Sequence, residues 1–293
     1  MAIDLTVDQL AAMIPSNKAN AAKWHKAMVE ILPKYKINTA QRIAGFIAQC
    51  AHESGDFRTL EENLNYSEKA LNSVFGRYFG PAPKRNAAEY ARNPEKIANY
   101  VYQDEFRSSK GAMGNTKKGD GWLFRGRGLK QLTGRNNYTA FGKTVDMTAE
   151  QAAEYVATEK GAIESACWFW DSAGCNKFAD AGDIVGLSKR INGGTIGLDD
   201  RVRRWEEALK ILGGKAAPVK IQEEKDDDVD DDIGVLRRGC KGEGVKLMQK
   251  ALGIGADGIF GPGTEKALKA WQTKNGLTAD GVAGPKTLEQ LLD

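Results

Sequence analysis

Apolar residues in the first 212 positions recur at helical spacing rather than in alternation. The clearest case is the stretch after Thr39, which we predict to be an N-cap. Apolar or small residues there share one helical face: Ile43, Phe46, Ile47, Cys50 and Ser54. The same spacing predicts helices over residues 7–13, 18–32, 68–75, 94–102, 149–155, 162–171, 183–191 and 200–212. No long alternating pattern of the kind typical of strands occurs in this region, so the sequence predicts a mainly α fold.

The C-terminal residues contain a repeat with a period of 23 residues. Residues 256–264 (ADGIFGPGT) match residues 279–287 (ADGVAGPKT). In each copy, Asp-Gly predicts a turn and Gly-Pro predicts the start of a helix, with Thr in its first turn. Apolar spacing predicts a further helix after Gly244. We therefore expect a compact three-helix unit here.

The charge pattern separates this repeat from the rest of the chain. Residues 223–232 carry eight acidic residues and one Lys, whereas residues 1–222 carry 32 Lys and Arg against 25 Asp and Glu. An acidic run of this kind repels itself and has little to bury, which predicts an extended linker. A calcium loop is disfavoured because the required glycine and terminal glutamate are absent. We predict a first domain at 1–214, a linker at 215–234 and a second domain at 235–293.

Composition narrows the class of protein. An apolar content of 41% suits a packed core, and no apolar run approaches the roughly 18 to 20 residues that span a bilayer. The first residues lack the basic and apolar segments of a secretory signal. These features predict a soluble protein that is made in the cytoplasm and does not insert stably into membranes. The mildly basic body favours polyanions, such as cell walls, anionic lipid or nucleic acid, without selecting one.

Cysteine and histidine usage argues against a metal enzyme. The chain has only two histidines, and no pair among its four cysteines shows CxxC spacing. A zinc amidase or zinc peptidase is therefore disfavoured, and we expect no metal and no cofactor. Reduced, buried thiols are favoured over a disulfide between Cys167 and Cys175, although the sequence leaves both open.

Glu53 is the first candidate for catalysis. It follows Cys50 by three residues, at the flank of the apolar helical face. Burial there should raise the pKa of its carboxyl group, as a general acid that protonates a glycosidic oxygen near neutral pH requires. On position alone, an ion pair with Arg42, a lysine or His52 is equally consistent.

Glycoside hydrolysis requires a second carboxylate, and Glu62 in Glu61-Glu62-Asn63-Leu64-Asn65-Tyr66 is a candidate. An inverting enzyme separates the two groups by roughly 6.5 to 9.5 Å to fit a water, and a retaining enzyme by about 5 to 5.5 Å. The sequence does not distinguish these two spacings.

Two glycine-containing segments offer polar groups for a sugar. In residues 126–133 (GRGLKQLT), the Gln131 amide can hold a sugar and the Thr133 hydroxyl can orient a water. Gly126 and Gly128 allow close backbone approach, but they are equally consistent with plain turns. Asn192 in residues 191–194 (INGG) offers a donor and an acceptor for an N-acetyl group. For Asn192 alone the turn interpretation is favoured, because Asn-Gly is a common turn dipeptide.

Taken together, residues 52–53, 62–66, 126–133, 137–138 and 191–194 resemble glycoside hydrolase family 19, with the likeness spanning most of residues 40–212. The resemblance implies a lysozyme-like, two-lobed helical catalytic domain. It also implies hydrolysis with inversion at the anomeric carbon, without metal or organic cofactor. It also implies that Glu53 is the general acid, Glu62 the general base and Thr133 the residue that positions the water. Substrate contacts are implied for four residues: Gln131, Asn192, Tyr66 and Tyr138.

The chain departs from the plant chitinases of that family. It continues after Glu53 with Ser54-Gly55-Asp56-Phe57, and its second glutamate follows sooner, as in the phage-type members. Because of this difference, Glu61, Glu68 and Glu105 remain alternative bases. Chitin and peptidoglycan, which are both β-1,4 linked, remain alternative substrates.

The repeat at residues 236–291 resembles peptidoglycan-binding domain 1, which implies a small wall-binding domain. With it, the chain resembles an endolysin that cuts peptidoglycan glycan strands as a monomer. Such an enzyme stays in the host cytoplasm until a holin-like protein lets it reach the periplasm and wall. A chitinase, a bacterial autolysin and a non-catalytic wall-binding phage component remain alternatives. Nucleic-acid binding is disfavoured, since no recognition motif is present and the acidic linker repels phosphate.

Overall fold

The computed structural model describes residues 5–81, 84–107, 111–194, 197–214, 236–277 and 279–292. Helices make up the regular secondary structure of these ranges, and isolated β-bridges occur between them. The predicted mainly α fold class is therefore confirmed. The predicted linker at 215–234 lies outside the described residues.

The chain divides into two compact units. The first comprises residues 1–62, 113–115 and 123–223, and the second comprises residues 63–112, 116–122 and 224–293. This division runs through the predicted first domain, because residues 63–112 group with the second unit. The boundaries drawn from the sequence at 214 and 234 stay a prediction.

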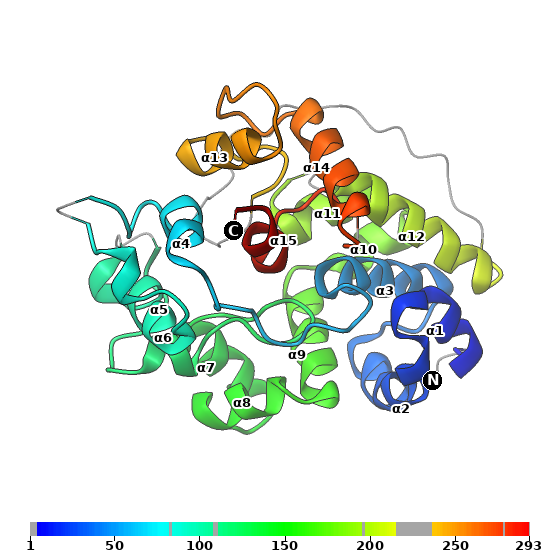
Figure 1. Ribbon diagram of the computed structural model, residues 1–293. Coiled ribbons are helices and arrows are strands. Elements are labelled where there is room, and N and C mark those ends of the chain that lie inside the picture. The colour runs from blue at the N-terminus through cyan, green and yellow to red at the C-terminus, as the bar shows by residue number, and fades with distance from the viewer. Residues whose placement is uncertain are drawn as a thin grey trace. The chain divides into compact units, whose positions relative to one another are not determined.

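The first unit is built from α-helices and two 3-10 helices (Figure 1). Their bounds are α1 (Val7–Met13), η1 (Pro15–Asn20), α2 (Ala21–Ile31), η2 (Leu32–Tyr35), α3 (Ala40–Ser54), α7 (Arg135–Thr144), α8 (Ala149–Val156), α9 (Glu159–Ser172), α10 (Cys175–Asp180), α11 (Ile184–Asn192) and α12 (Leu198–Ile211).

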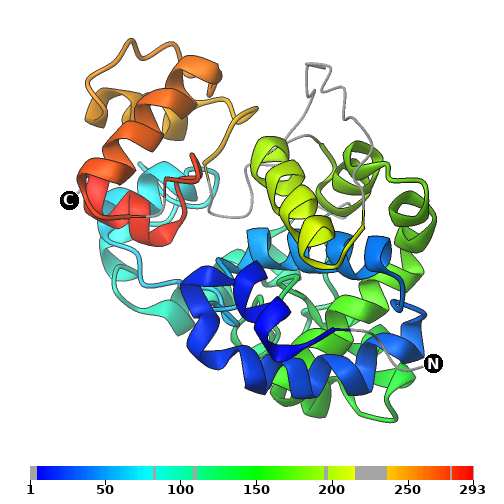
Figure 2. The ribbon, with the colours of Figure 1, turned by 90° about the vertical axis from the view of Figure 1, so that its right-hand side faces the viewer.

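Helix α3 is the central element of this unit. Thr39 caps it as predicted, with its Oγ1 accepting a hydrogen bond from the Arg42 N–H at 3.3 Å. Every position from Ile43 to Ala51 is buried. Helix α12 packs along it, as Figure 2 shows. A methyl group on Gly45 would lie 3.2 Å from the Leu187 side chain, so α11 also packs closely on α3.

Helices α7 and α10 were not expected from the sequence. Helix α7 has no side-chain N-cap hydrogen bond, and it buries only Tyr138, Phe141 and Gly142. Its other positions are polar or small, so the apolar pattern is too sparse to predict a helix. Tyr138 and Phe141 instead join a separate apolar cluster with α8.

The second unit contains further helices from residues 63–122 and from residues 236–292. Their bounds are α4 (Glu68–Val74), η3 (Ala87–Glu89), α5 (Pro94–Val101), η4 (Asp104–Phe106), α6 (Asp120–Leu123, whose last residue belongs to the first unit), α13 (Glu243–Ala251), α14 (Pro262–Lys274) and α15 (Pro285–Leu292).

The predicted repeat appears as two matching sets of hydrogen bonds. In the first copy, Gln249 Nε2 donates to Asp257 Oδ1 at 2.8 Å, while its Oε1 accepts from the Gly258 N–H at 2.9 Å. In the second copy, Gln272 makes the same bonds to Asp280 and to the Gly281 N–H, at 2.8 and 2.9 Å. Each buried glutamine thereby fixes the Asp-Gly turn that precedes the next helix. This confirms the predicted helical C-terminal module.

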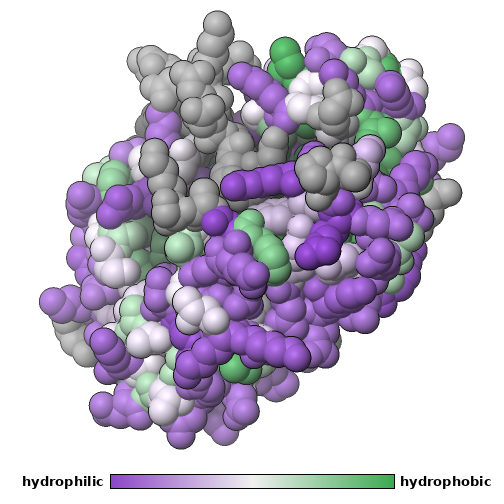
Figure 3. Space-filling model, turned by 90° about the vertical axis from the view of Figure 1, so that its left-hand side faces the viewer, coloured by the Kyte–Doolittle hydropathy of each residue, from purple (hydrophilic) through white to green (hydrophobic). Residues whose placement is uncertain are grey.

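The surface is largely hydrophilic on the face drawn in Figure 3. Large hydrophobic side chains that are exposed within the described ranges are Val7, Val29, Phe106 and Ile259. Within those ranges, every helix is too short or too polar to cross a bilayer. All four cysteines are buried and unbridged.

Candidate active site

Glu53 lies in the last turn of α3. The helix ends at Gly55, which has a φ of +57°, a conformation that glycine adopts without strain. Ser54 strengthens this end by donating from Oγ to the Cys50 carbonyl at 2.6 Å and accepting from the Phe57 N–H at 2.9 Å. The carboxylate of Glu53 is therefore held on a rigid helix end, with its side chain 21% exposed.

Two cations from distant parts of the chain meet the Glu53 carboxylate. Arg201 of α12 donates from Nη2 to Glu53 Oε1 at 2.7 Å, and Lys130 Nζ lies 3.1 Å from the same oxygen. The Arg201 side chain is only 1% exposed and also donates to Gln49 Oε1. The structure thus shows an ion pair of the kind expected from position, with a lysine, Lys130, as one partner and Arg201 in place of Arg42 or His52 as the other. The role of Glu53 as general acid stays a prediction.

The expected rise in the Glu53 pKa is therefore wrong for the ligand-free protein. Burial does raise the pKa, but the charges of Lys130 and Arg201, together with the Arg201 hydrogen bond, lower it by more. The pKa of Glu53 lies well below its ordinary value. The carboxyl group is ionised at neutral pH in this state.

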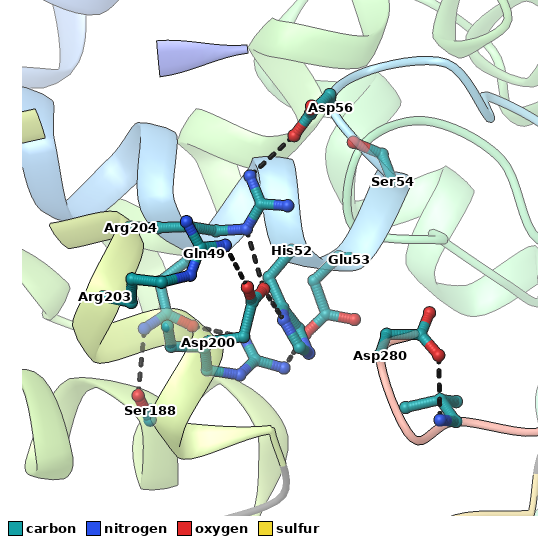
Figure 4. Close-up of polar contacts among 12 residues, drawn as sticks. Gln49, His52, Glu53, Ser54, Asp56, Ser188, Asp200, Arg203, Arg204 and Asp280 are labelled. Carbon is teal, nitrogen blue, oxygen red and sulfur yellow. Dashed lines mark hydrogen bonds and ion pairs between the residues drawn. The ribbon is translucent and has the colours of Figure 1, made fainter. Parts of the chain in front are cut away.

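His52 belongs to a second polar network that joins α3 to α12 (Figure 4). Its Nδ1 lies 2.7 Å from Asp200 Oδ2, which also accepts from Arg204 Nε at 2.7 Å. Arg204 extends this network by donating from Nη1 to Asp56 Oδ1 at 2.6 Å. Burial lowers the pKa of His52 more than Asp200 raises it. The network therefore holds a neutral imidazole beside Glu53 at neutral pH.

The predicted base, Glu62, is held by the backbone of Gly126. The Glu62 N–H donates to the Gly126 carbonyl at 3.0 Å, and the Gly126 N–H donates to Glu62 Oε1 at 2.5 Å. A methyl group placed on Gly126 would lie 3.3 Å from Glu62 Oε1, 2.9 Å from Gln131 Oε1 and 3.3 Å from Thr133 Oγ1. The structure thus brings together Glu62, Gln131 and Thr133 around one point above Gly126.

The neighbouring Glu61 has a different environment. Its carboxylate accepts from Arg125 Nη2 at 2.6 Å and from Arg127 Nε at 3.3 Å. Burial raises the pKa of Glu61, but the two arginines outweigh this effect and lower it. These ion pairs fix the segment that carries Glu62, and Glu61 is better placed as an anchor than as a base.

Residues 126–133 reach both carboxylates through a tight turn. Gln131 has a φ of +51°, which is unusual for a residue other than glycine. The turn is closed by Gln131 Nε2 donating to the Gly128 carbonyl at 3.1 Å. Thr133 Oγ1 donates to the Gln131 carbonyl at 2.9 Å. Lys130 pairs with Glu53, while its neighbour Gln131 lies beside Gly126, as Glu62 does.

The remaining predicted contacts lie elsewhere in the two units. Asn192 is in the last turn of α11, five residues before Gly197. Gly197 lies close to His52, since a methyl group added to Gly197 would lie 2.4 Å from the His52 ring. Tyr138 is fully buried, and its hydroxyl donates to the Arg125 carbonyl at 2.9 Å. Tyr66 is 2% exposed, with its ring 5.3 Å from that of Phe75 in the second unit. Both tyrosine rings are packed inside the protein in this state, and their role as substrate contacts stays a prediction.

The other alternative bases, Glu68 and Glu105, belong to the second unit, in the first turn of α4 and in η4. Within the described residues, His, Cys, Asp and Glu side chains form no group of three suited to a metal ion.

Sequence reasoning missed Arg201 and Lys130. Arg201 could have been found, because it falls on the same helical face as Leu198, Val202 and Trp205, and a buried arginine needs a carboxylate partner. Lys130 gave no such signal, since its pairing depends on the turn at Gln131.

Comparison with known proteins identifies the family. A protein of Haemophilus influenzae, described as a glycosyl hydrolase family 19 domain-containing protein, is 40% identical over 175 residues. The match covers 59% of this chain and 80% of that relative. The chain belongs to glycoside hydrolase family 19.

Solved structures agree with this family 19 fold. Chitinase C from Streptomyces griseus HUT6037 superposes with a TM-score of 0.50 at 18% identity, covering 73% of this chain and 95% of that one. A mutant of chitinase C gives the same TM-score at 16% identity, with the same coverage. At these identities the likeness shows the fold alone.

A family model described as a peptidoglycan binding domain matches residues 241–291. This match covers α13, α14 and most of α15. The protein is therefore a family 19 glycoside hydrolase that carries a peptidoglycan-binding module.

Proposed function

We propose that this family 19 enzyme hydrolyses β-1,4 glycosidic bonds of bacterial peptidoglycan with inversion, and that it acts as an endolysin. Glu53 is the general acid, Glu62 the general base, and Thr133 positions the attacking water. Gln131 and Asn192 contact the sugar. The observation that carries this assignment is the convergence of Glu62, Gln131 and Thr133 around Gly126.

The base side of this mechanism follows from hydrogen-bond chemistry. The Thr133 hydroxyl donates to the Gln131 carbonyl, so its oxygen is left to accept a hydrogen bond from water. Glu62 can accept the second proton of that water as it attacks the anomeric carbon. The Gly126 N–H holds one oxygen of Glu62 in place. A base that is fixed in this way loses little orientational freedom on reaching the transition state.

On the acid side, Glu53 delivers a proton to the leaving glycosidic oxygen as the bond to the anomeric carbon breaks. Its carboxyl group must hold a proton at that moment, which it does not do in the ligand-free state. Binding of substrate must therefore raise the proton affinity of Glu53. A change in its contacts with the two cations is the means that the site offers.

The peptidoglycan-binding module supports cell wall as the substrate rather than chitin. A module that holds the enzyme on the wall raises the local concentration of the catalytic residues there. In the endolysin role, the enzyme accumulates in the host cytoplasm and reaches the wall when a holin-like protein opens the inner membrane. A chitinase or a bacterial autolysin is the alternative role.

The catalytic assignment is tested with purified peptidoglycan. Wild type should release fragments with new reducing ends, which mass spectrometry identifies, and Glu53→Gln and Glu62→Gln should not. Glu68→Gln and Glu105→Gln test the alternative bases and should retain activity. Release of free amino groups instead of reducing ends, or full activity of Glu53→Gln, would exclude the mechanism.

The endolysin role has a separate test. Expression in a bacterial cytoplasm should leave cells intact until the inner membrane is opened with chloroform or a co-expressed holin, and lysis should follow at once. High activity on colloidal chitin, with none on sacculi, would favour the chitinase alternative.

A further inference from the structure

Lys130 occupies an unusual position for a residue next to a general acid. Its ammonium group lies 3.1 Å from the Glu53 oxygen that already accepts from Arg201. The ammonium group also lies over the ring of Phe169, with Nζ 5.5 Å from the ring centroid. Two cations on one oxygen stabilise the ionised form of Glu53, which is the wrong form for donating a proton.

Lys130 has fewer described hydrogen-bond partners than Arg201. Arg201 is buried between α12 and α3 and also bonds to Gln49, which in turn donates to Ser188 Oγ at 3.0 Å. Removing Arg201 from Glu53 would break this buried network. Lys130 comes from a loop, its side chain is 14% exposed, and its four-carbon stem is flexible.

The other titratable groups near Glu53 do not supply a charge that could take the place of the Lys130 ammonium group. His52 is neutral at neutral pH and is engaged with Asp200. Burial raises the pKa of the Cys50 thiol to about 12, so it carries no charge. Lys130 is therefore the contact through which a bound ligand can alter the charge state of Glu53.

The ligand that would attract this ammonium group is an anion. Peptidoglycan carries carboxylates on its peptide stems, next to the glycan bonds, whereas chitin is neutral. Lys130 also precedes Gln131, whose amide lies with Glu62 and Thr133. A substrate carboxylate that reaches this segment can therefore meet the Lys130 ammonium group.

We propose that Lys130 makes this active site selective for anionic peptidoglycan: a carboxylate of the peptide stem takes the ammonium group away from Glu53, and a neutral glycan does not. Glu53 then takes a proton from solvent and passes it to the leaving glycosidic oxygen. This inference rests on the proposed role of Glu53 as general acid.

The test compares two forms of one substrate. Soluble glycan strands with uncrosslinked stem peptides are used either as isolated or after their carboxylates have been converted to methylamides. Initial rates of reducing-end release give kcat/KM for each form across pH. Wild type should cleave the native form at least about tenfold faster than the amidated form, since one neighbouring charge shifts a carboxyl pKa by about 1 to 3 units.

Variants at Lys130 separate its role from general effects. Lys130→Met should cleave both forms at similar rates, and the basic limb of its pH profile should move up by about one unit, because Glu53 keeps its proton to higher pH. Lys130→Arg should keep the preference for the native form. Lys177→Met is the matched control, since Lys177 also lies over a phenylalanine ring, that of Phe178. It should behave as wild type.

The outcomes distinguish this inference from the proposed function. Equal wild-type rates on the two forms would overturn the role of Lys130, and this comparison needs no variant to fold. An unchanged basic limb in Lys130→Met would also overturn it. If wild type releases no reducing ends from the native form, or Glu53→Gln remains active, the proposed function itself fails.

Discussion

Replacing Gly126 with alanine should reduce catalysis while leaving the fold intact. The added methyl would lie 2.9 Å from Gln131 Oε1 and 3.3 Å from both Glu62 Oε1 and Thr133 Oγ1. The closest of these atoms is the end of a flexible side chain, which can rotate away. Gly126 is not among the glycines with positive φ, so alanine fits its backbone. The substitution therefore acts on the proposed site of the attacking water.

The size of the effect follows from this geometry. The methyl occupies the space between the base and the hydroxyl that is proposed to position the water. Misplacing reacting groups by about 1 Å can lower a rate by about 100-fold. Such a loss corresponds to about 2.7 kcal/mol in the activation free energy. The free energy of unfolding should change by less than about 1 kcal/mol, because alanine also restricts the unfolded chain.

The assay measures initial rates of reducing-end release from soluble glycan strands, and urea denaturation gives the free energy of unfolding. Gly263→Ala in α14 is the control, because a methyl there meets no atom within 4 Å. It should cleave the soluble substrate at the wild-type rate. If Gly126→Ala stays within about threefold of wild type while folding normally, the convergence around Gly126 does not hold the attacking water.

Three further predictions concern stability. Arg201→Met should lower the free energy of unfolding by about 3 kcal/mol, because the Glu53 carboxylate loses its buried partner; a loss below about 1 kcal/mol in urea denaturation would contradict this. Burial raises the pKa of Asp200, but its hydrogen bonds and neighbouring charges lower it far below the ordinary 3.8. The stability that Asp200 contributes is therefore fully present above that pH and is lost progressively as the pH falls below it toward the lowered folded-state pKa, so the difference in thermal unfolding between wild type and Asp200→Asn should be smaller at pH 2 than at pH 6. Gln249→Leu and Gln272→Leu should each destabilise the module by about 1 to 3 kcal/mol and weaken sedimentation with sacculi, with no loss of activity on soluble strands.

The sequence predicted the position of Glu53 but not its charge state. Apolar spacing and the Thr39 cap were sufficient to place the residue at the flank of a buried helical face. Its pKa depends on Lys130 and Arg201, which are 77 and 148 residues further along the chain. A local pattern gives the burial of a carboxylate but not the charges that tertiary packing brings to it.

Tertiary packing also determines the environment of Tyr138, which the local sequence did not indicate. Tyr138 lies in a motif with polar neighbours, so a substrate contact was a reasonable expectation for its hydroxyl. In the structure α7 turns the ring into an apolar cluster with Phe124, and the hydroxyl reaches the Arg125 carbonyl. Because α7 itself carries little apolar periodicity, neither the helix nor the direction of its buried face could be predicted.

Residues 126–133 supply side chains to the surroundings of both candidate carboxylates, Glu53 and Glu62. A strand in this position would send Lys130 and Gln131 to opposite faces, and a regular helix would send them about 100° apart. With a positive φ at Gln131, the segment folds back on itself: Lys130 pairs with Glu53, while Gln131 and Thr133 lie with Glu62 around Gly126. A non-glycine residue in this conformation costs of order 1 kcal/mol. That strain is opposed by the anchoring of the segment through Arg127 to Glu61, and it places the contacts of the proposed acid and the proposed base on adjacent residues.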